Sequence, residues 1–131
     1  MPNHEIELIL SRQLADHLSI PVFLVDTKGT LLFFNDAAED LLGLRYEETG
    51  ALPADEWSML FKPQDEHGKL LLLDELPLVK TLKQKTPEHG AFWIIGLDGK
   101  QHKISVTSFP ILGRPNRFLG AMALFWKSDV S

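Results

Sequence analysis

The chain has 131 residues, of which 44% are hydrophobic and 24% are charged, a composition typical of one soluble globular domain. It contains no cysteine, which excludes disulfides, thiolate zinc sites and cysteine nucleophiles. The formal net charge of −5 argues against nucleic acid as a direct partner, because phosphate binding requires a basic surface. The leucine run at 70–73 is too short to cross a bilayer, and residues 1–18 lack the features of a secretory signal, so we expect a cytoplasmic protein without a membrane partner.

The first predicted element is an amphipathic helix over Met1–Leu18, which is followed by Pro21. Its apolar residues recur at the four-residue spacing of one helical face: Ile6, Leu10, Leu14 and Leu18. We therefore divide the chain into an N-terminal helical segment, residues 1–20, and one domain over residues 21–128.

Two short strands are predicted after this helix. Val22–Val25 and Leu31–Phe34 are apolar runs, and the segment Asp26–Gly29 between them consists of residues that favour a turn. The two strands are therefore expected to pair as a hairpin.

Two short helical segments are predicted next. The first is capped by Asn35 or Asp36, with Glu39 placed to complete a capping-box-like pair with Asp36, and it ends at Gly43. Residues 44–68 are irregular in pattern. Within them, three residues are spaced as one short helical face: Trp57, Leu60 and Phe61.

A clearer helix is predicted over Asp74–Lys85. Asp74 is its expected cap, and Pro77 lies in the first turn, where the missing N–H of proline costs nothing. The apolar stripe of this helix consists of Leu78, Val79 and Leu82. Three strands are predicted in the rest of the chain, over Ala91–Leu97, His102–Ile111 and Phe118–Lys127.

The register of the first of these strand pairs is open. A two-residue turn at Asp98-Gly99 places Trp93 opposite Ile104. A three-residue loop with Gly99 in a left-handed bulge instead places Phe92 and Ile94 on the face of Ile104 and Val106.

The last strand is apolar on both faces. One face carries Met122, Leu124 and Trp126, and the other carries Ala121, Ala123 and Phe125. Because an exposed apolar sheet face is rare, we expect the outside of the sheet to be covered, by the N-terminal helix or by a second subunit.

An ordered series of motifs resembles the PAS domain family from about Pro21 onward. It consists of Pro21–Asp26 with Gly29, Leu32–Asn35, Ala37–Gly43, Glu47–Gly50, Asp74–Leu78, Leu97–Gly99 and Phe118–Met122. The resemblance implies an α+β fold with a five-stranded antiparallel sheet in the order 2-1-5-4-3 and short helices over one face. It also implies a cavity between sheet and helices, which many members use for haem, flavin or small organic ligands, and pairing of two copies through an N-terminal helix.

The resemblance favours the three-residue loop at Asp98-Gly99, and with it an apolar inner face. The residues expected to bind a ligand there are Phe33, Leu42, Leu60, Phe61, Val79, Leu82, Phe92, Ile94, Ile104, Val106, Ser108, Met122 and Leu124. Such a lining suits a small apolar ligand, or a filled core without a ligand. The outer face is expected to carry Trp93, Ile95 and Phe125.

No cofactor is identified by the sequence. Haem-binding relatives carry a histidine on the long helix, whereas the five histidines here lie elsewhere: His4, His17, His67, His89 and His102. The flavin adduct of light-sensing relatives needs a cysteine and is excluded. The acidic pairs Asp55-Glu56 and Asp65-Glu66 lack the regular spacing of a calcium loop, so we interpret them as solvated charge.

The expected function is a non-enzymatic sensory module, since no phosphate loop, zinc motif or nucleophile elbow is present. It would bind a small apolar ligand and pass the signal on as a homodimer or to a separate output protein. The expected dimer interface consists of Leu10, Leu14, Leu18, Trp93 and Phe125. The alternative is a ligand-free dimerisation domain, and a haem- or flavin-binding sensor ranks behind both.

Overall fold

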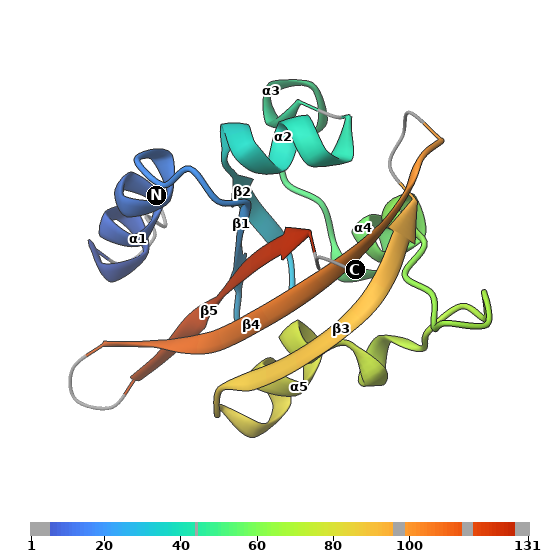
Figure 1. Ribbon diagram of the computed structural model, residues 1–131. Coiled ribbons are helices and arrows are strands. Elements are labelled where there is room, and N and C mark those ends of the chain that lie inside the picture. Colours follow the sequence, from blue (N-terminus) through green and yellow to red (C-terminus); the bar gives the residue numbers. More distant parts are fainter. Residues whose placement is uncertain (1–5, 44, 96–98, 114–116, 128–131) are drawn as a thin grey trace.

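The computed structural model describes residues 6–43, 45–95, 99–113 and 117–127. In chain order the elements are α1 (Ile6–Asp16), β1 (Val22–Asp26), β2 (Leu31–Phe34), α2 (Asp36–Leu42), α3 (Tyr46–Thr49), α4 (Ala54–Phe61), the 3₁₀ turn η1 (Leu73–Glu75), α5 (Pro77–Gln84), β3 (Glu88–Ile95), β4 (Gln101–Gly113) and β5 (Arg117–Lys127). Figure 1 shows α1 on one side of the sheet and α4 and α5 on another side. The first helix is shorter than predicted within the described residues, because it ends at Asp16 rather than Leu18.

The five strands form one antiparallel sheet in the order β2-β1-β5-β4-β3, which confirms the predicted fold class and strand order. The register of β3 on β4 is also confirmed, because Phe92, and not Trp93, lies opposite Ile104. Gly99 has a φ of +81°, the left-handed conformation expected of it. The three residues before it, 96–98, lie outside the described residues.

The predicted orientation of β5 is wrong. Val106 lies opposite Phe125, so Phe125 shares the inner face of the sheet and Met122 and Leu124 point outward. The physical reason is that β5 is apolar on both faces, so its hydrophobic pattern fits either register equally well. A slip of one residue then exchanges the two faces.

The inner face of the sheet carries the larger core. Phe23, Phe34 and Phe125 pack there against Trp57 and Phe61 of α4 and against the first turns of α5. Gly120 allows β5 to approach β1 closely: its φ is +153°, and a Cβ at this position would lie 2.2 Å from the carbonyl oxygen of Val25. Only glycine fits there without movement of the backbone.

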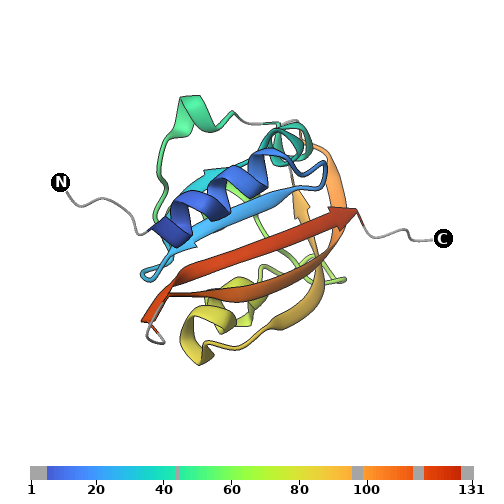
Figure 2. The same ribbon diagram turned by 90° about the vertical axis from the view of Figure 1, so that its left-hand side faces the viewer.

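A second, smaller core lies on the outer face, beneath α1. Ala15 is fully buried there, together with Val22, Leu24, Phe33 and Met122. Figure 2 shows α1 lying across the sheet, along β1. Leu10 and Leu14 of the stripe predicted for α1 do not face the sheet, since each is 56% exposed. The small side chain of Ala15 lets the helix lie close to the sheet, and this orientation turns the leucines outward.

Asn35 joins α1, β1 and α2. Its Oδ1 accepts hydrogen bonds from the backbone N–H of Val22 (3.0 Å) and of Ala38 (3.1 Å), so Asn35 is the cap of α2 and Asp36 is its first residue. Its Nδ2 donates to the carbonyl oxygens of Ala15, Leu18 and Ile20 at 2.9–3.3 Å.

The predicted pairing of Glu39 with Asp36 is wrong. The cap lies one residue earlier than that pairing requires, and the Glu39 carboxylate instead accepts a hydrogen bond from the N–H of Tyr46 (2.8 Å). At Gly43 the helix ends in a left-handed conformation, as predicted (φ 72°).

The start of α5 differs from the prediction by one short turn. Pro77 is the first helical residue, as expected, but Leu76 is the cap. Asp74 lies in η1 instead, because residues 73–75 form a separate 3₁₀ turn, and its carboxylate pairs with the ammonium group of Lys83.

Candidate functional site

An apolar cavity of about 60 Å³ lies between the inner face of the sheet and the helices α4 and α5. Its walls are Phe23, Leu42, Trp57, Ser58, Phe61, Pro63, Leu76, Pro77, Leu78, Phe92, Ile94, Ile104, Val106, Ala123 and Phe125. Ser58 is the one hydroxyl side chain among these residues, and its hydroxyl is within 3.4 Å of the carbonyl oxygen of Asp55 in its own helix.

Aromatic rings fix the shape of one wall. The ring of Phe23 lies 5.0 Å from Phe125, 5.6 Å from Phe61 and 6.2 Å from Trp57, between ring centroids. Two of these contacts are edge-to-face, the arrangement that aromatic quadrupoles favour. Trp57 also donates its indole N–H to the carbonyl oxygen of Gly29 (2.9 Å), which anchors α4 to the β1–β2 turn.

Six of the residues predicted to bind a ligand line this cavity. They are Leu42, Phe61, Phe92, Ile94, Ile104 and Val106. The structure brings them together because β3 and β4 pair in the predicted register and because α2 and α4 lie above the same sheet face.

Seven other predicted residues lie elsewhere. Leu60, Val79 and Leu82 pack in the inner core without facing the cavity, and Phe33, Met122 and Leu124 belong to the outer core. Phe33 is on the outer face because its neighbour Phe34 takes the inner position, and adjacent strand residues point to opposite faces.

Ser108, the seventh, is fully buried and does not line the cavity. Its hydroxyl oxygen is 2.7 Å from that of Thr81 on α5, which is also fully buried. The two hydroxyls therefore satisfy one another and tie α5 to the centre of β4.

Sequence reasoning missed the nine remaining lining residues. Ala123 and Phe125 were missed through the register of β5, and Phe23 was missed because β1 is also apolar on both faces. Pro63 belongs to a segment without periodicity, and Leu76 and Pro77 lie in the first turn of the predicted helix 74–85, outside its apolar stripe.

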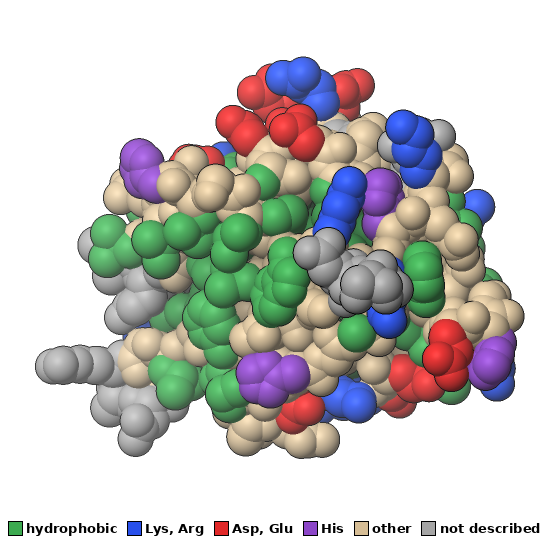
Figure 3. Space-filling model, in the orientation of Figure 1, with side chains coloured by type: hydrophobic (Ala, Val, Ile, Leu, Met, Phe, Trp, Pro, Cys, Tyr) green, Lys and Arg blue, Asp and Glu red, His purple; other side chains and the backbone are tan. Residues whose placement is uncertain are grey.

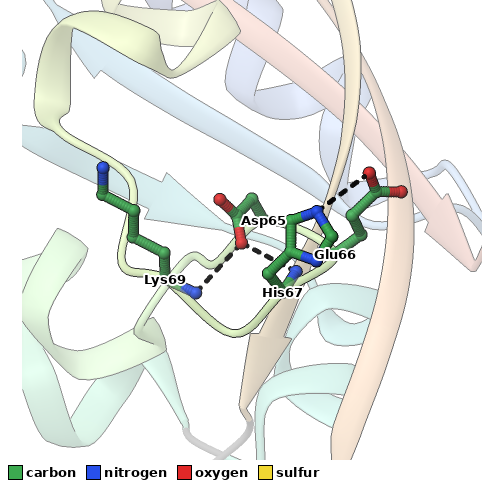
Figure 4. Close-up of polar contacts among 4 residues, drawn as sticks. All are labelled: Asp65, Glu66, His67 and Lys69. Atoms are coloured by element: carbon green, nitrogen blue, oxygen red, sulfur yellow. Dashed lines mark hydrogen bonds and ion pairs between the residues drawn. The ribbon is translucent and has the colours of Figure 1, made fainter.

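The acidic pair at Asp65 belongs to an exposed turn (Figure 4). The Asp65 carboxylate accepts backbone hydrogen bonds from His67 (2.8 Å) and Lys69 (3.0 Å), and Glu66 lies 3.5 Å from the His67 ring. These bonds, that of Lys69 above all, hold the pKa of Asp65 below its ordinary value of 3.8. Within the described residues, no group of three or more His, Cys, Asp or Glu side chains is arranged to hold a metal ion.

Apolar side chains also remain exposed on the outer side of the molecule. Ile9, Leu10 and Leu14 of α1 are 46–56% exposed, and Trp126 at the end of β5 is 42% exposed. Trp93 lies half-buried on β3, opposite Lys103. We call these five side chains the outer apolar surface, and Figure 3 shows apolar side chains gathered over the side of the molecule where α1 lies.

Two members of the predicted dimer interface do not belong to this surface. Phe125 is only 4% exposed and points inward, because of the register of β5, and Trp126 takes the outward position. Leu18 is half-buried against the outer core. No helix in the described part of the chain is long and apolar enough to span a membrane.

The family model for the PAS domain matches residues 10–77, just over half of the chain. The chain belongs to the PAS domain family. Its match begins within α1 and ends at the start of α5. No curated protein sequence matches the chain significantly.

Solved structures share the PAS fold at low sequence identity. A PAS domain from Colwellia psychrerythraea is 17% identical with a TM-score of 0.65, over 95% of this chain and 98% of that chain. The LOV protein of Rhodobacter sphaeroides is 14% identical with a TM-score of 0.75, over 97% of this chain and 70% of that one. The PAS domain of nitrogen regulation protein NR(II) from Vibrio parahaemolyticus is 18% identical with a TM-score of 0.63, over 91% and 98%.

The pKa of Asp65 gives a direct test of the turn in this PAS domain. We expect the carboxyl group to titrate below 3.8 in the folded protein, because its charged form accepts two backbone hydrogen bonds. A carboxyl with a lowered folded pKa stabilises the fold above its unfolded pKa, and this contribution is lost as the pH falls below about 4. A carbon-detected NMR titration measures it, and an Asp65 pKa at or above 3.8 would contradict the assignment.

Proposed function

We propose that this PAS domain is a non-catalytic sensory module that binds a small apolar molecule in the cavity beside Phe23. The observation that supports this proposal is an apolar cavity between the inner face of the sheet and the helices, where a close-packed core would leave no space. Its walls come from α2, α4, α5 and four strands, so a ligand there would touch most elements of the domain at once.

The size of the cavity limits the ligand. A cavity of about 150 Å³ holds benzene, whereas about 60 Å³ holds only a few heavy atoms, so a ring-sized ligand requires one wall to move. The segment over residues 62–76 is the wall with the least regular structure. It is held to β3 by two backbone hydrogen bonds between Gln64 and Trp93, at 2.7 and 2.9 Å, and we expect it to yield first.

A conformational change caused by the ligand would pass from the cavity to the surface through β1. Phe23 lines the cavity, while its neighbours Val22 and Leu24 pack in the outer core against Ala15 of α1. A ligand that displaces Phe23 would therefore shift the strand on which α1 lies. The exposed side of α1 would then carry the change to a partner.

A second candidate function is dimerisation without a ligand, favoured by the outer apolar surface. Three neighbouring side chains of one helix, Ile9, Leu10 and Leu14, are about half exposed. We propose a second copy of this chain as the occupant, because both α1 helices could then bury the same stripe against each other in a two-fold arrangement. A separate output protein on this surface is the alternative partner.

Filling the cavity tests the ligand proposal. The substitution Ala123→Val adds two methyl groups to a lining residue on β5. We expect it to weaken binding of toluene about tenfold or more, because the added groups occupy the ligand's space, while the melting temperature stays equal or rises. NMR titration with toluene measures this binding.

The control for this experiment is Leu124→Val, one residue along the same strand on the opposite face. It should leave toluene binding unchanged. Equal affinities of all three proteins would place the ligand outside this cavity, and no binding to the wild type would leave dimerisation as the function.

Introducing a charge on α1 tests the dimer. Leu14→Asp places a carboxylate in the outer apolar surface and should raise the dimer dissociation constant about tenfold or more, because the charge would be desolvated in the interface. Sedimentation velocity measures the dissociation constant.

Met59→Asp is the control, since it places the same charge at an exposed apolar side chain of α4, away from α1. It should have a much smaller effect. A wild-type protein that stays monomeric at millimolar concentration, or equal effects of the two substitutions, would contradict a dimer through α1.

A further inference from the structure

His102 lies on β4 at the edge of the cavity wall. It is opposite Ile94 on β3 and two residues before Ile104 on β4, and both of these residues line the cavity. Alternation along a strand puts His102 on the same inner face as Ile104, and side chains of directly opposed residues lie about 5 Å apart at their Cβ atoms. His102 is not itself a lining residue, but it lies on the inner face of the sheet, next to two residues that line the cavity.

The Nε2 atom of His102 is buried and has no hydrogen-bond partner among the described residues. Other polar groups of the inner layer are satisfied. The indole N–H of Trp57 donates to Gly29, and the hydroxyls of Thr81 and Ser108 bond to one another. A buried nitrogen without a partner is costly to a folded protein, so its position next to an apolar cavity calls for an explanation.

We propose that the cavity takes a small apolar molecule that carries one hydroxyl group, and that Nε2 of His102 binds this hydroxyl. The apolar part of the molecule would occupy the space between Phe23 and Ile104, and the hydroxyl would lie toward the start of β4. A hydroxyl group both donates and accepts, so it pairs with Nε2 in either tautomer of the neutral ring. This inference rests on the proposed ligand-binding function and adds the chemistry of the ligand to it.

The experiment compares phenol with toluene, which have nearly the same shape and differ in a hydroxyl and a methyl group. Dissociation constants of both compounds are measured by NMR titration for the wild type, His102→Leu and His102→Gln. Leucine removes the polar atom, whereas the terminal amide of glutamine places a hydrogen-bonding group near the position of Nε2. The measured quantity is the ratio of the toluene constant to the phenol constant in each protein, which cancels any general change in the cavity.

We expect the ratio to fall about fivefold in His102→Leu, the factor that corresponds to one net hydrogen bond, and to be restored at least in part in His102→Gln. A ratio that is the same in all three proteins, with both compounds bound, would overturn the role of His102 and leave the ligand-binding function standing. Failure of both compounds to bind the wild type would overturn both. If His102→Leu does not fold, equal ratios in the wild type and in His102→Ala at lower temperature would equally overturn the role of His102.

Discussion

The side chain of Asn35 contacts five backbone groups at the point where α1, β1 and α2 meet. The Asn35 side chain is 2% exposed, so loss of these bonds would leave buried polar groups without partners. Its side-chain oxygen accepts hydrogen bonds from the first turn of α2 and from Val22, the first residue of β1. Its side-chain nitrogen donates to the carbonyl group of Ala15 in α1 and to two carbonyl groups in the chain that follows. One side chain therefore fixes the outer helix relative to both the sheet and the inner layer of helices.

Two features of the surface follow from this constraint. With its C-terminal end held by Asn35, α1 lies on the sheet through Ala15, and its leucines face outward. The guanidinium group of Arg12 packs over the ring of Phe33, 4.5 Å from its centroid, and holds the middle of the helix to the outer face of β2. The same strand pair, β1 and β2, carries Phe23 and Phe34 on its inner face. The helix α1 and the cavity therefore lie on opposite faces of the same two strands.

Much of the fold could be predicted from the sequence, because local signals agreed with one another. The strands at 22–25 and 31–34, the end of α2 at Gly43 and the position of Pro77 follow from turn, cap and proline chemistry. The strand order came with the family resemblance and not with any pattern. Six of the fifteen lining residues could be predicted, in part because β4 alternates cleanly between Ile104, Val106 and their polar neighbours.

The remaining part of the site depends on information that the sequence does not carry locally. The final strand is apolar on both faces, so its register follows from pairing with β4 and not from its own pattern. The leucine stripe of α1 is more hydrophobic than the Ala15 face, yet the helix packs through Ala15 because a small residue allows the closer approach. Hydrophobicity alone therefore predicts the wrong face of this helix.

Asn35 holds the outer helix to the sheet and to α2, and native-state hydrogen exchange of Asn35→Ser tests this role most directly. Serine still caps α2, but it is too short to reach the carbonyl groups of Ala15, Leu18 and Ile20. We predict that amide exchange in residues 9–18 becomes faster by about tenfold or more, while exchange in α2 and in β4 stays near the wild-type rate. Unchanged exchange in α1, or an equal acceleration in every element, would contradict it.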